Sequence, residues 1–110
     1  MFCSRLHRIE MEIEQLREKY LDLINRELPA QAKQRQFPVR FNHCFARIIL
    51  DNLFNCCWYE AIDRKKGAAY KQLSVEQLQQ AIAIAEEIIN RPDTYIQQLN
   101  ENSLRWRGKL

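Results

Sequence analysis

The sequence predicts an all-α protein, a small four-helix bundle of three long helices and one short one, with a long N-terminal helix that carries a heptad pattern. The 110 residues include only two glycines and three prolines, so the material for the tight turns of a β fold is scarce. Apolar residues recur instead at helical spacing over long stretches. The composition, 46% hydrophobic and 28% charged, is typical of one globular domain, which we expect to span residues 1–110.

The first predicted helix covers residues 4–27. Its apolar residues are spaced alternately three and four apart, as the a and d positions of a coiled coil are: Leu6, Ile9, Ile13, Leu16, Tyr20 and Leu23. Pro29 should end this helix, because a residue that precedes proline is disfavoured in the α conformation. These six residues, which we call the seam, are candidates for self-association, and the alternative is that they pack inside the bundle.

A central helix is predicted over residues 42–63, after a polar and basic connection over residues 30–41. Apolar residues occupy nearly every face of this helix, which is typical of a buried central helix. The charged run from Asp63 to Gly67 should form a turn in water.

The start of the third helix carries the clearest local signal in the chain. Ser74 and Gln77 have the spacing of a capping box, and Leu73 and Leu78 flank them as a hydrophobic staple. These features predict a helix over residues 75–90. A short helix over residues 94–102 should follow, and residues 103–110 should form a loose basic tail.

One polar stripe interrupts the central helix. His43, Arg47, Asp51 and Asn55 are four residues apart, so they share one face of the helix. Arg47 could bind a phosphate or carboxylate there, with His43 as acid or base and Asp51 orienting either group. The alternative is an intrahelical ion pair on a solvated face.

Basic residues gather in two segments, one of which contains Lys33, Arg35 and Arg40. The other is the C-terminal tail, whose residues are Arg105, Trp106, Arg107 and Lys109. Cations interleaved with aromatic rings are typical of nucleic-acid-binding surfaces. The formal net charge is only +3, however, so a solvated basic tail is the alternative.

The cysteines predict a reduced, cytoplasmic setting, because their spacing is not that of a disulfide framework: Cys3, Cys44, Cys56 and Cys57. Adjacent helical residues diverge, so Cys56 and Cys57 do not form a typical pair of zinc ligands either. We therefore expect buried free thiols, and no metal or cofactor. No stretch approaches the apolar length that a membrane span requires, so we expect no contact with a membrane.

The motifs of nucleotide-binding loops, nucleophile elbows and zinc proteases do not occur in the sequence, which argues against catalysis. The sequence therefore favours a non-catalytic interaction or adaptor protein, with a protein partner or a second copy bound through the first helix. Nucleic-acid binding through the two basic segments is the first alternative. A small helical enzyme or anion-binding protein that uses the polar stripe is the second.

Overall fold

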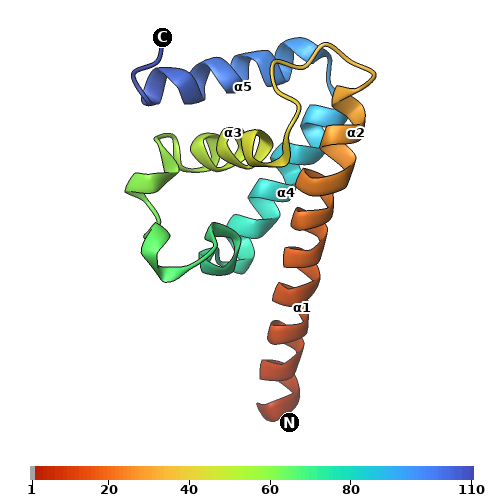
Figure 1. Ribbon diagram of the computed structural model, residues 1–110. Coiled ribbons are helices and arrows are strands. Elements are labelled where there is room, and N and C mark those ends of the chain that lie inside the picture. Colours follow the sequence, from red (N-terminus) through yellow and green to blue (C-terminus); the bar gives the residue numbers. More distant parts are fainter. Residues whose placement is uncertain (1) are drawn as a thin grey trace.

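The computed structural model describes the backbone of residues 2–110 and the side chains of residues 12–110 (Figure 1). The predicted all-α class is confirmed, because no strand occurs within residues 2–110. The α-helices there are α1 (Phe2–Asp22), α2 (Leu28–Ala32), α3 (Asn42–Phe54), α4 (Val75–Asn90) and α5 (Asp93–Trp106).

The N-terminal helix continues past Pro29, so its predicted end at residue 27 is wrong. A π-helical segment, Leu23–Glu27, joins α1 to α2, and at its end the Leu28 N–H donates to the Leu23 carbonyl five residues back. A proline lacks an N–H and collides with the carbonyl four residues earlier in a regular helix. The wider π turn avoids this collision, so the helix continues through Pro29, the second residue of α2. Because α2 extends to Ala32, the connection is shorter than the predicted 30–41.

The central helix α3 ends at Phe54, well before the predicted boundary at residue 63. Asn55 adopts the left-handed conformation, with φ of 56°, and the N–H groups of Asn55 and Cys56 both donate to the Asp51 carbonyl. Asparagine tolerates this conformation better than most residues, so α3 ends at this position. The link to α4 consists of short 3₁₀ turns at Trp58–Glu60, Arg64–Lys66 and Ala69–Gln72.

Helix α4 spans the residues that the sequence predicts, Val75–Asn90. The Gln77 N–H donates to Ser74 Oγ at 3.1 Å, and the Ser74 N–H donates to Gln77 Oε1 at 2.9 Å. Leu73 and Leu78 on either side are both buried. Local capping chemistry alone therefore defines where this helix begins.

Helix α5 is longer than the predicted 94–102, and residues 103–106 of the predicted loose tail belong to it. Its C-terminus closes with Gly108 at φ of 69° and a hydrogen bond from the Lys109 N–H to the Leu104 carbonyl. This arrangement is a Schellman motif, for which glycine is the favoured residue. Ser103, the first residue of the predicted tail, is completely buried.

The helices pack as two pairs, α1 with α4 and α3 with α5, and α3 also contacts α4. Figure 1 shows α3 and α5 lying side by side and running across the direction of α1. One hydrophobic core joins the pairs, and its completely buried side chains include Leu28, Phe45, Ile48, Ile49, Leu78 and Ile96. Three of the predicted site residues, Arg47, Asp51 and Arg107, lie at the α3–α5 contact.

Candidate functional sites

The four residues of the predicted polar stripe lie in different environments in the structure. His43 is exposed at the start of α3, and its ring stacks on Phe41 with centroids 5.9 Å apart. Asn55 is exposed in the turn that ends α3. Arg47 and Asp51, by contrast, face α5. The four residues therefore do not converge on one ligand position.

Arg47 and Asp51 belong to a network of hydrogen bonds, which we call the α3–α5 clamp. Asp51 is completely buried and accepts hydrogen bonds from Ser103 Oγ at 2.6 Å, from the Trp58 N–H at 2.9 Å, and from Arg107 Nε and Nη2 at 2.7 and 3.1 Å. Arg47 donates to Ser103 Oγ at 2.7 Å and to Asn100 Oδ1 at 2.8 Å. Every partner comes from this chain, so the clamp satisfies its own buried polar atoms.

The electrostatics of the clamp are those of a structural ion pair. The hydrogen bonds that Arg107 donates to the Asp51 carboxylate hold the pKa of Arg107 above its ordinary value, while burial lowers the pKa of Arg47. Within residues 12–110, no three His, Cys, Asp or Glu side chains lie close enough to hold a metal ion.

The seam packs inside the molecule where its side chains are described. Tyr20 and Leu23 are 1% and 2% exposed, and burial raises the pKa of the Tyr20 hydroxyl. Ile13 and Leu16 are half-buried against the same core. The side chains of the two remaining seam residues, Leu6 and Ile9, lie outside the described residues, as do those of Cys3 and His7.

The first predicted basic segment divides into two parts. Arg35 is held inside the structure: its Nε donates to Asp93 Oδ1 at 2.7 Å, and its Nη1 donates to the Ile89 carbonyl at 2.8 Å. The Gln36 N–H also donates to Asp93, and the bond from Arg35 is the main reason that the pKa of Asp93 lies below its ordinary value. Lys33 and Arg40 remain exposed.

Lys33 and Arg40 border a groove of about 400 Å³, which we call the Phe41 groove. Pro29 and Ala32 of α2 form its apolar part, and Phe41 completes it. The Phe41 ring is 65% exposed, whereas the nearby Phe37 is 9% exposed. No carboxylate lines this groove, and neither cation makes an ion pair among residues 12–110.

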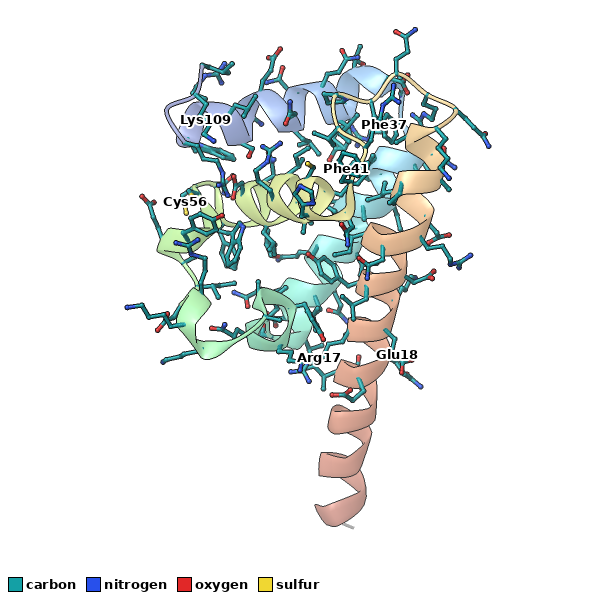
Figure 2. All side chains as sticks on the ribbon, viewed as in Figure 1. Arg17, Glu18, Phe37, Phe41, Cys56 and Lys109 are labelled. Carbon is teal, nitrogen blue, oxygen red and sulfur yellow. The ribbon has the colours of Figure 1, made fainter. Side chains whose placement is uncertain are left out.

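At the other end of α3, Arg107 of the predicted tail and Arg64 of the 3₁₀ turn Arg64–Lys66 both contact Tyr59. We call the surface formed by these two segments the basic end. Two guanidinium groups contact the Tyr59 ring, with the Arg64 Cζ 3.7 Å and the Arg107 Cζ 4.7 Å from its centroid. Further exposed side chains at the basic end come from both segments: Lys65, Lys66, Arg105, Trp106 and Lys109. Figure 2 shows Cys56 and Lys109 near this end of α3 and Phe41 at its start.

The two predicted basic segments therefore lie at opposite ends of the α3–α5 pair, because Arg35 bonds the first residue of α5 and Arg107 bonds α3 near its last turn. The sequence analysis does not place Phe41, Tyr59 or Arg64 at a basic surface. Phe41 falls in the predicted connection over residues 30–41, Tyr59 in the predicted central helix and Arg64 in the predicted charged turn. The run of cations at residues 64–66 was the only available signal.

Comparisons with known proteins identify no relative: no family model, curated protein or solved structure matches this chain. Within the described residues, none of the helices has the length and apolar character that crossing a membrane requires.

Proposed function

We propose that this protein is a non-catalytic interaction module that binds a short protein segment in the Phe41 groove. The segment carries acidic side chains and one apolar anchor. The observation that carries the proposal is the 65% exposure of Phe41 in a groove that is also lined by two cations, neither of which has a carboxylate partner among residues 12–110.

The apolar part of the groove supplies the affinity. Covering an exposed aromatic ring removes a large apolar area from water, and such rings are enriched among the residues that dominate binding energy. Pro29 and Ala32 provide a floor of small aliphatic groups beside the ring. One leucine-sized or aromatic side chain of the partner fits this combination.

The charges of the groove select the partner. Lys33 and Arg40 both border the apolar part, so a partner with carboxylates beside its apolar anchor meets opposite charge. An arginine also binds a carboxylate with two parallel hydrogen bonds, which adds geometric selectivity. A basic segment of the same shape is repelled, and high salt weakens the acidic one.

The polar stripe supports a non-catalytic role, because its two central residues are used by the fold. Asp51 is completely buried and hydrogen-bonded, and Arg47 bonds to α5. The alternative partner is a second copy of the chain, bound through the seam of the N-terminal helix. Tyr20 and Leu23 already fill the core of their own chain, which favours a separate partner.

Binding of synthetic peptides tests the proposal. Isothermal titration compares a short peptide of aspartate and glutamate around one leucine with a peptide in which lysines replace the acids. We expect binding of the acidic peptide only, and about tenfold or greater weakening by Phe41→Ala or by Lys33→Glu with Arg40→Glu.

The matched control is Lys65→Glu with Lys66→Glu, which removes the same charge at the other end of α3 and should leave peptide binding unchanged. Circular dichroism checks that each variant is folded. Binding that is equal in the Phe41→Ala variant contradicts the proposal, and so does a concentration-dependent dimer in sedimentation velocity that buries the Phe41 groove.

A further inference from the structure

The basic end is built around a tyrosine ring that contacts two arginines, and the two arginines come from distant parts of the chain. Tyr59 belongs to the turn that follows α3, Arg64 to the next turn, and Arg107 to the end of α5. Each guanidinium lies within the range of a cation–π interaction with the ring. These contacts tie three segments into one surface.

Arg107 is the fixed member of this surface. Its guanidinium donates to both carboxylate oxygens of Asp51, and its side chain is 12% exposed. Because its charge is matched by a buried carboxylate, Arg107 positions Tyr59 and contributes little charge to the surroundings. Tyr59 also contacts Arg64, which is exposed.

The exposed charge of the basic end is strongly positive. Five exposed cations come from the 3₁₀ turn and from the C-terminal segment: Arg64, Lys65, Lys66, Arg105 and Lys109. The acids nearest to these cations in the sequence are Glu60 and Asp63 beside the turn and Glu101 one helical turn before Arg105, and Asp63 caps the turn by accepting the Lys65 N–H at 2.9 Å. None of the five cations makes an ion pair among residues 12–110, so their charge is available to an anion in solution.

Exposed aromatic rings accompany these cations. The Tyr59 side chain is 44% exposed and Trp106 is 37% exposed, although both are large rings that gain from burial. Trp106 lies in the last turn of α5, directly between Arg105 and the fixed Arg107. The surface therefore combines flat aromatic groups with point charges spaced along two segments.

We propose that the basic end binds single-stranded nucleic acid. Its cations bind successive phosphates, while an unstacked base lies on the Trp106 ring or on the stack of Arg64 and Tyr59. A duplex offers the phosphates but no free base face, so the aromatic exposure favours a single strand. An anionic lipid surface would use the same cations without requiring stacking.

This site is independent of the Phe41 groove. The 13 residues of α3 separate the two surfaces by about 20 Å at the ordinary rise of a helix. Failure of one proposal therefore leaves the other standing, and charge reversals at each surface serve as controls for the other.

Fluorescence anisotropy with labelled oligothymidine measures the binding directly. We expect the single strand to bind at low salt and the logarithm of affinity to fall linearly with the logarithm of salt concentration. Lys65→Glu with Lys66→Glu should reduce this slope by at least about 1.4, because each lost phosphate contact contributes about 0.7 for a single strand. The control Lys33→Glu with Arg40→Glu should leave the slope unchanged.

Tryptophan emission tests the stacking. Oligothymidine should quench the emission of the native chain, and most of this quenching should vanish in Trp106→Phe. Trp106→Leu should weaken binding by about five- to 150-fold, the usual contribution of one stacked base. Circular dichroism verifies that both variants keep their helices.

Three outcomes overturn the proposal. The first is a salt slope that is the same in the Lys65/Lys66 double variant as in the native chain. The second is affinity for duplex DNA equal to that for oligothymidine, together with unchanged binding in Trp106→Leu. The third is binding to vesicles of phosphatidylserine and phosphatidylcholine in the absence of any binding to oligothymidine.

Discussion

The two helix pairs of this protein are held together by different chemistry. Helices α1 and α4 meet mainly through apolar side chains, since Leu16, Tyr20 and Leu23 of the N-terminal helix join the same core as the buried face of α4. One exposed ion pair, between Lys19 and Glu86 at 3.6 Å, lies at the edge of this contact. That face consists of Leu78, Ala81, Ile82, Ala85 and Ile88. Helices α3 and α5 also meet through apolar residues, but the clamp around the completely buried Asp51 dominates one side of their contact.

The two kinds of contact therefore have different effects: apolar packing mainly stabilises the fold, whereas the hydrogen bonds mainly fix the relative position of two helices. Apolar contact is non-directional, so it stabilises the α1–α4 pair without requiring one precise register. Hydrogen bonds to a buried carboxylate are directional, and a missing partner leaves an uncompensated charge. The clamp therefore sets where α5 lies along α3, and with it the position of Arg107 beneath Tyr59.

Removing the carboxylate of the clamp should have the largest effect. We expect Asp51→Ala to lower the free energy of unfolding by about 3–5 kcal/mol, because it leaves Arg107 buried without its partner. Urea denaturation followed by circular dichroism measures the loss. The exposed Glu60→Ala serves as a control, with a change within about 0.5 kcal/mol. A stability of Asp51→Ala equal to that of the native chain would show that the clamp is not coupled to folding.

At the apolar pair, Leu78→Ala should cost about 3 kcal/mol, because Leu78 is completely buried and its loss leaves a cavity. The same urea experiment measures this effect. In contrast to charge interactions at the surface, the loss should be equal at low and high sodium chloride concentrations. A cost below about 1 kcal/mol would mean that the surrounding core collapses into the cavity.

Within the clamp, Ser103→Ala should cost about 2 kcal/mol. The Ser103 hydroxyl accepts from Arg47 and donates to Asp51, so its removal leaves both groups one partner short. Exchange of the α5 amide hydrogens should accelerate, while that of α4 changes less. Equal acceleration in α4 and α5 would contradict the separation between the two pairs.

The smallest effect concerns acid sensitivity at the start of α5. The pKa of Asp93 is lowered in the folded protein, first by the hydrogen bond from Arg35 and then by that from the Gln36 N–H. The contribution of ionised Asp93 to the free energy of unfolding is therefore fully present above its unfolded pKa of about 3.9. Stability should fall as the pH drops below that value, through the lower folded pKa. Urea midpoints measured between neutral and acidic pH should fall less in Asp93→Asn. An identical pH dependence in the variant would exclude this contribution.

The parts of the fold that depend on local chemistry could be predicted from the sequence. The bounds of α4 follow from the Ser74–Gln77 capping box and from the periodicity after it, since both act within a few residues. The all-α class follows from the scarcity of glycine and from helical spacing. Pro29 misled the prediction because the cost of a proline is avoided by a π turn, which the sequence pattern does not reveal.

The candidate sites depend on contacts between distant segments, and these could not be predicted. The spacing of Arg47 and Asp51 placed them on one helix face, but their partners Ser103 and Arg107 are more than fifty residues away in the sequence. The same partners extend α5 through a segment predicted to be a loose tail. Tyr59 became part of a surface only because Arg64 and Arg107 meet over its ring.

The two central residues of the polar stripe, Arg47 and Asp51, serve the α3–α5 contact, and a double-mutant cycle on Asp51 and Arg107 tests this role most directly. Urea unfolding of Asp51→Leu, Arg107→Met and the double variant gives the coupling energy. We predict a coupling of about 2 kcal/mol or more, with the double variant recovering much of the stability that each single variant loses. If the stability losses of the two single variants sum to the loss of the double variant within about 0.5 kcal/mol, the two residues are not coupled, which would contradict the clamp.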